Sequence, residues 1–202
     1  MNAFGGPRDF GRCGQQPPDG GPTRIFVGVP LPPDLLPVVN RAQETLQEIP
    51  GVRLTRPEQL HVTLAFIGEV EVDKVQAAVQ IVEDIPPSLG GAVPLGEMLA
   101  LPSASRARVM TLALDDSGQV LQRLFEMVMS ALEREGVMQR EKRPFRAHLT
   151  IARLRRPVAV QPKYQCEPVG YEVSSVCLYR SQLLRSGAVY TVVKRQVLEV
   201  AR

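Results

Sequence analysis

The two histidines of this 202-residue chain constrain its fold more than any other feature, because both stand in the same local pattern. His61 opens the stretch HVTLA, and His148 opens the stretch HLTIA 87 residues later. The β-branched and apolar residues of both stretches are typical of strands. A repeat of this kind indicates either a duplicated element or one chemical need met by two elements. The sequence therefore predicts two related halves whose histidine strands face each other.

Side chains alternate between the two faces of a strand, so each histidine should share a face with the threonine two places on. We expect the opposite, apolar face of each strand to be buried, and the histidine face to line a cleft with a small alanine that leaves room for a ligand. This assigns to the cleft face His61, Thr63 and Ala65 from the first strand and His148, Thr150 and Ala152 from the second. The aromatic residues Phe66, Tyr179 and Tyr190 are expected in the core.

Strand and helix patterns share the rest of the chain. Strands are predicted over residues 24–29, 52–68 (two short strands around Pro57, with Gly68 ending the second), 92–99, 108–114, 143–154, 173–183 and 188–198. Helices are predicted over residues 33–49, 72–85 and 118–135, the last capped by Asp115, Asp116 or Ser117 and closed by Gly136. Because many strands follow one another directly, we expect an α+β fold with mostly antiparallel pairing.

Composition and length limit the class of protein. The Gly/Pro-rich residues 1–22 read as a flexible tail, and residues 23–202 suit one domain of two lobes. No apolar run reaches the roughly 20 residues of a membrane span, and the N-terminus lacks the apolar core of a secretory signal. Three cysteines without a CxxC pair (Cys13, Cys166 and Cys177) favour the cytoplasm and argue against a cysteine-built zinc site. The net charge of +3 permits a phosphate-bearing partner without requiring one.

Two histidines and two threonines on facing strands suit phosphoester chemistry without a metal. One imidazole can act as a base while the other acts as an acid, and threonine hydroxyls can donate to phosphate oxygens. Of the basic residues around the second strand (Lys142, Arg143, Arg146, Arg153, Arg155 and Arg156), Arg153 lies directly past the pattern and is the candidate phosphate clamp. Alternation places Arg153 on the wrong face unless the strand bulges or ends there. Two other interpretations of the histidines are possible. They could be partly buried residues with a structural role only, or they could belong to a metal site, which would lack the third and fourth ligands that zinc usually takes.

The motifs HVTL and HLTI make the chain resemble the 2H phosphoesterases, which are named for two H-x-T-x motifs. Within that group it most resembles the bacterial and archaeal RNA 2′,3′-cyclic phosphodiesterases, once called 2′-5′ RNA ligases. The similarity extends from RIFVGVPLP through LHVTLAFIGEV and RPFRAHLTIARL to YTVVKRQVL, although Ala147 stands where relatives often have proline. The resemblance implies a bilobal α+β fold with a pseudo-two-fold cleft and no cofactor. It implies hydrolysis of a 2′,3′-cyclic phosphate to a 2′-phosphomonoester, with His61 as proton donor, His148 as proton acceptor, and Thr63, Thr150 and Arg153 on the phosphate.

Two other functions stay open at this point. The same histidines could catalyse the reverse reaction and form a 2′-5′ bond, or the chain could bind RNA ends or nucleotides without turnover. We expect the substrate to be RNA with a 2′,3′-cyclic phosphate end or a small cyclic nucleotide. We expect the protein to be a cytoplasmic monomer that takes part in RNA processing and makes no contact with a membrane.

Overall fold

The computed structural model describes residues 21–140, 143–162, 164, 169–185 and 187–200. Residues 1–20 of the predicted tail lie outside the described residues, and so do Cys13, Lys142 and Cys166. The strands are β1 (Thr23–Pro30), β2 (Val52–Leu54), β3 (His61–Val70), β4 (Gly91–Leu101), β5 (Ala107–Leu114), β6 (His148–Val158), β7 (Val169–Val173), β8 (Ser175–Leu184) and β9 (Gly187–Val197). The α-helices are α1 (Leu36–Glu44), α2 (Val72–Glu83) and α3 (Val120–Arg134).

The nine strands of the described residues belong to one antiparallel sheet in the order β7-β4-β5-β6-β3-β1-β8-β9, with β2 added to β6. The two histidine strands, β3 and β6, lie at its centre and pair antiparallel through Val62 and Leu149. Each is followed outward by three further strands. The sheet is thus two matching halves joined at the histidine strands, and the predicted α+β fold with mostly antiparallel pairing is confirmed.

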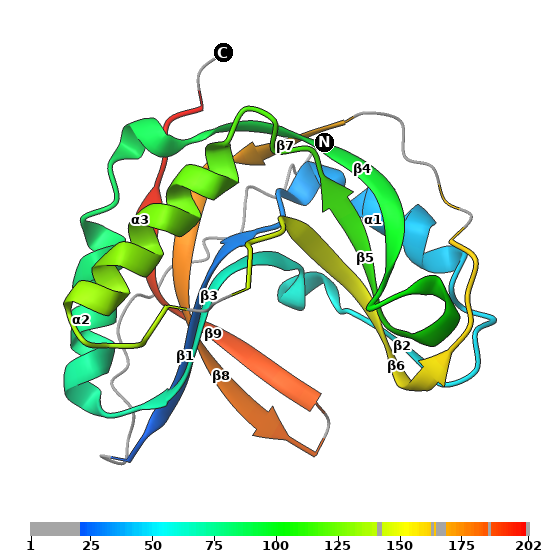
Figure 1. The fold of residues 1–202 in the computed structure, drawn as a ribbon, viewed down its shortest axis with the longest axis horizontal. Helices are drawn as coiled ribbons and strands as arrows, with labels where there is room; N and C mark the ends of the chain where they lie inside the picture. The colour runs from blue at the N-terminus through cyan, green and yellow to red at the C-terminus, as the bar shows by residue number, and fades with distance from the viewer. Residues whose placement is uncertain (1–20, 141–142, 163, 165–168, 186, 201–202) are drawn as a thin grey trace, which may run out of the picture.

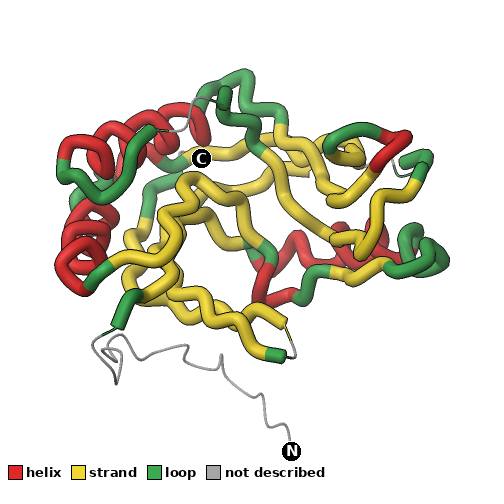
Figure 2. Tube along the Cα trace, turned by 60° about the horizontal axis from the view of Figure 1, so that its bottom comes forward, coloured by secondary structure: helices red, strands yellow, loops and turns green. Residues whose placement is uncertain are grey.

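The helices cover the outside of a strongly curled sheet (Figure 1). Each helix that precedes a histidine strand packs on the other half: α1 contacts β6, and α3 contacts β3. Helix α2 packs beside α3 and covers β1, β8 and β9. Figure 2 shows the helices at the periphery and the strands around the middle of the molecule. This exchange of helices fixes the relative placement of the two halves, and therefore of the two histidines.

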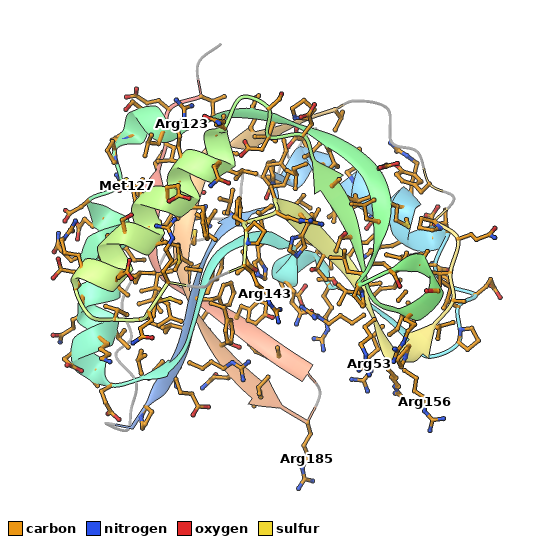
Figure 3. The ribbon with its side chains drawn as sticks, in the orientation of Figure 1. Arg53, Arg123, Met127, Arg143, Arg156 and Arg185 are labelled. Atoms are coloured by element: carbon orange, nitrogen blue, oxygen red, sulfur yellow. The ribbon has the colours of Figure 1, made fainter. Side chains whose placement is uncertain are left out.

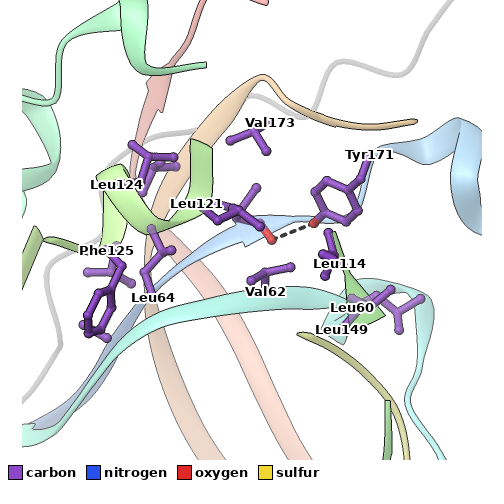
Figure 4. Packing of buried hydrophobic residues seen from close by; sticks show 14 of the residues in the cluster. Leu60, Val62, Leu64, Leu114, Leu121, Leu124, Phe125, Leu149, Tyr171 and Val173 are labelled. Atoms are coloured by element: carbon purple, nitrogen blue, oxygen red, sulfur yellow. Dashed lines mark hydrogen bonds between the residues drawn. The ribbon is translucent and has the colours of Figure 1, made fainter. Parts of the chain in front are cut away.

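Apolar side chains from both halves merge into one core, part of which Figure 4 shows. Val62, Leu64 and Leu149 on the outer faces of the histidine strands are each at most 3% exposed, and they meet Leu121 and Leu124 of α3 there. The hydroxyl of Tyr171 in β7 donates to the carbonyl oxygens of Pro30 (2.8 Å) and Val29 (3.0 Å) in β1. This buried contact ties the outermost strand of one half to the other half.

Several local predictions hold, and others need correction. Asp116 caps α3 through the amides of Leu121 and Gln122, and Gly136 ends that helix at φ +64°. Helix α1 stops at Glu44, short of residue 49, because the next hydrogen bonds span three residues and tighten into turns. Gly68 does not end β3: it takes φ +87° within a strand that runs on to Val70. The strand β7 was not predicted.

Candidate active site

Both histidine strands bulge at the same point of the repeated pattern. In β3, Thr63 pairs with Gly28 and Ala65 with Val27, which leaves Leu64 without a partner. In β6, Thr150 pairs with Thr111 and Ala152 with Met110, which leaves Ile151 without a partner. A β-bulge of this kind inserts one residue and reverses the alternation of side chains beyond it. The repeat in the sequence is therefore also a repeat in backbone geometry.

The bulges change which side chains reach the cleft. Ala65 and Ala152 were expected there, but they are 3% and 0% exposed and belong to the core. The next residue along each strand turns into the cleft instead: Phe66, 45% exposed, in β3 and Arg153 in β6. The prediction that Phe66 is a core residue is thus wrong, and the bulge that Arg153 needs to reach the histidine face is present.

The side chain of Gln43 in α1 holds the β6 bulge in place. Its Nε2 atom donates to the carbonyl oxygens of Ile151 and Thr55, both at 2.8 Å. The amide of Thr55 also donates to the carbonyl of Ile151 at 2.8 Å. The bulge leaves Ile151 without a partner in β5, and its carbonyl accepts from these two donors instead. Each such hydrogen bond contributes about 0.5–1.5 kcal/mol of stability. Gln43, only 7% exposed, thereby stabilises the backbone that directs Arg153 into the cleft.

A cleft of about 700 Å³ opens on the concave side of the sheet. Its floor holds His61, Thr63, Thr150 and Arg153 from the two central strands. One wall comes from β2 and the turn that follows it, through Arg53, Leu54, Thr55, Arg56 and Gln59. The other wall comes from the hairpin of β8 and β9, which contributes Tyr190. Tyr190 was expected in the core but lines this cleft, whereas Tyr179 is 7% exposed and lies in the core as predicted. Arg143 lines a separate hollow beside α3.

The two histidine rings are held in the same way. The Nδ1 atom of His61 lies 2.7 Å from the carbonyl oxygen of Gln59, and that of His148 lies 2.7 Å from the carbonyl oxygen of Arg146. A carbonyl only accepts, so each Nδ1 carries the proton, and each Nε2 is left for the site. His148 is half-buried at the start of β6 and does not line the cavity itself, yet it is close enough for its charge to act on His61.

The surroundings of His61 lower its pKa from 6.5 to about 4. Burial is the main cause, since the ring lies 4.7 Å from that of Phe26 and 5.5 Å from that of Tyr190, centroid to centroid. The hydrogen bond to the Gln59 carbonyl raises the pKa, and the positive charges of Arg153 and His148 lower it further. Gly28 leaves space for the ring: a Cβ there would lie 3.2 Å from His61 Cδ2 and 2.8 Å from the Val62 carbonyl oxygen.

The described residues include no group of three or more His, Cys, Asp or Glu side chains that could hold a metal ion. None of the helices described is long and apolar enough to cross a membrane.

Comparison with known proteins points to one family. Residues 29–110 match the family model described as LigT like Phosphoesterase. The chain is 30% identical over 182 residues to the RNA 2′,3′-cyclic phosphodiesterase of Methanothermobacter thermautotrophicus, covering 83% of this chain and 95% of that protein. The fold superposes on the crystal structure of TT0787 from Thermus thermophilus with a TM-score of 0.77 at 26% identity, covering 87% and 97% of the two chains. It also matches Escherichia coli LigT complexed with 3′-AMP (TM-score 0.70, 25% identity, 88% and 98%).

Proposed function

The chain belongs to the LigT-like phosphoesterase family, and we propose that it hydrolyses 2′,3′-cyclic phosphate ends of RNA to 2′-phosphomonoesters. The observation that carries this proposal is the pair of matched bulged strands. They bring His61, two threonines and an arginine to one cleft. His148, whose ring is held as that of His61 is, stands at the start of the second strand, near enough for its charge to act on His61. RNA ends and small cyclic nucleotides both carry the reacting group. Since one chain supplies every group, we expect the monomer to be active.

His148 is the base in this proposal. Its Nδ1–H is held by a backbone carbonyl, so in the neutral ring Nε2 keeps a lone pair. Nε2 removes a proton from water as the water oxygen attacks phosphorus. The bond between phosphorus and the ribose 3′-oxygen then breaks, and the new monoester stays on the 2′-oxygen.

His61 is the acid and gives a proton to the departing 3′-oxygen. In the free protein it is neutral near pH 7, because its pKa lies at about 4. An anionic phosphate beside Nε2 favours the protonated ring and raises that pKa. Binding of the substrate therefore favours the charged form of His61, which is the form that can donate a proton. The direction of ring opening follows from the family resemblance.

Thr63, Thr150 and Arg153 stabilise the phosphoryl group as charge builds on its oxygens. The two hydroxyls flank the bulges, one from each half of the sheet, and can donate from opposite sides. Arg153 supplies a charged, two-pronged donor. Phe66 offers an exposed ring for the terminal base, because nucleobases stack on aromatic side chains without regard to sequence.

The test is incubation of a 5′-hydroxyl oligoribonucleotide ending in a 2′,3′-cyclic phosphate, with EDTA present, and chromatography against 2′- and 3′-phosphate standards. We expect a 2′-phosphate end at an unchanged rate in the chelator. A 3′-phosphate product would refute the acid and base assignments. A 2′-5′-joined product would establish the reverse reaction as the main one, and tight binding without turnover would establish a binding protein.

A further inference from the structure

The cleft carries more positive charge than a cyclic phosphate requires. A 2′,3′-cyclic phosphodiester has one negative charge, and Arg153 alone can neutralise it. Arg24, Arg53, Arg56 and Arg185 line the same cleft, and none of the described residues that line it is acidic. Of the four, Arg56 is paired with Glu58 at 3.8 Å. These four arginines come from three separate segments of the chain, so the charge is a property of the folded cleft.

Arg53 stands in a position that is unfavourable without an anion. In the pairing of β2 with β6 it lies directly opposite Arg153, and both side chains are exposed. Paired residues on antiparallel strands have Cβ atoms about 4.5–5.5 Å apart, and like charges at that distance destabilise the sheet. Within the described part of the chain, no carboxylate forms an ion pair with Arg53 or Arg153. An anionic ligand that spans both guanidinium groups would remove this repulsion.

Arg185 extends the charge to the other side of the cleft mouth. Figure 3 shows Arg53 beside the end of β6 and Arg185 at the tip of the β8–β9 hairpin. These are the two segments that form the walls of the cleft. The two walls are tied together where Gln59 Nε2 donates to the Ala188 carbonyl oxygen at 2.5 Å. Leu183, 68% exposed, adds an apolar surface to the hairpin wall. Proteins bind single-stranded nucleic acid through a positively charged groove that follows the backbone and through aromatic rings on which bases stack, and Phe66 supplies an exposed ring in this cleft.

We propose that the mouth of the cleft binds the RNA backbone upstream of the cyclic end, with Arg53 and Arg185 contacting phosphates of the preceding nucleotides. The proposal rests on the proposed function, which places the cyclic phosphate at the histidines. It makes the enzyme prefer oligonucleotides to cyclic mononucleotides, through contacts separate from the reacting groups.

The test compares kcat/KM for adenosine 2′,3′-cyclic phosphate and for a pentaribonucleotide with the same end, between 50 and 200 mM salt. Wild type, Arg53→Ala, Arg185→Ala and the charge-matched control Arg123→Ala, on the outer α3 helix, are measured. Each mouth variant should lower kcat/KM for the pentanucleotide about three- to tenfold and leave the mononucleotide within about twofold. Each should also make the slope of log kcat/KM against log salt shallower by about 0.7. Arg123→Ala should change neither substrate.

Equal losses on both substrates would overturn the proposal, because Arg53 would then serve the cyclic phosphate itself. An unchanged pentanucleotide rate in both variants would also overturn it, and the proposed function would stand. If wild type hydrolyses neither substrate, the proposed function is refuted, and the RNA-binding proposal is then tested by measuring Kd. Arg53→Ala must then weaken binding of a 2′-phosphate-ended pentanucleotide but not of adenosine 2′-monophosphate.

Discussion

Acidification should destabilise this protein through His61. The ring is neutral in the folded state down to a pKa of about 4, while in the unfolded chain it titrates at 6.5. Between these values the unfolded state binds a proton that the folded state does not, so stability falls as the pH falls. From pH 8 to pH 5 the loss from this one group is about 2 kcal/mol, and it approaches about 3 kcal/mol at pH 4.

Urea unfolding at pH 8 and pH 5, followed by circular dichroism, measures this loss for wild type, His61→Gln and His148→Gln. The His61→Gln variant should show a pH-dependent loss about 2 kcal/mol smaller than wild type, whatever its stability at pH 8. The His148→Gln control retains the His61 contribution. Equal losses in wild type and His61→Gln would refute the claim that His61 is held neutral by its aromatic surroundings.

Four further substitutions test the geometry of the site, all measured by kcat/KM together with urea unfolding. Thr63→Val and Thr150→Val should each lose about 1–3 kcal/mol of transition-state stabilisation with folding intact; wild-type rates would place the hydroxyls away from the phosphate. Gly28→Ala should cost about 1–3 kcal/mol of stability and displace the His61 imidazole, which lies against Gly28. The control Gly170→Ala, which has open space at its Cβ, should do neither. Equal effects of the two substitutions would show that His61 does not need the space that Gly28 leaves. Gln43→Met removes two hydrogen bonds and should lower stability by about 1–3 kcal/mol. It should raise KM more than the threonine variants do, because the bulge that Gln43 stabilises directs Arg153 into the cleft. An unchanged KM would show that the bulge forms without Gln43.

The central strands could be predicted from the sequence because their signal is local. His61 and His148 each carry an apolar, β-branched pattern that indicates a strand and a shared face with the threonine. The order of the strands and the meeting of β3 with β6 depend on contacts between residues far apart in the chain, and periodicity does not report those.

The bulges explain most of what prediction missed. Ideal alternation places Phe66 in the core and Arg153 away from the histidines, and both placements are wrong by one inserted residue. The β6 bulge is stabilised by Gln43, which lies 108 residues from Ile151 in the sequence, so no local sequence pattern predicts it. Arg53 was missed for a similar reason, since only the pairing of β2 with β6 places it opposite Arg153.

The most direct test of paired histidine catalysis is single-turnover hydrolysis of the cyclic-phosphate oligonucleotide by His61→Ala and His148→Ala, with thermal unfolding confirming that both variants fold. Each substitution should lower the rate about 10²–10⁴-fold, the span expected for loss of a general acid or base. Either variant retaining a rate within about threefold of wild type would show that its histidine does not act on the phosphate, and would contradict the account.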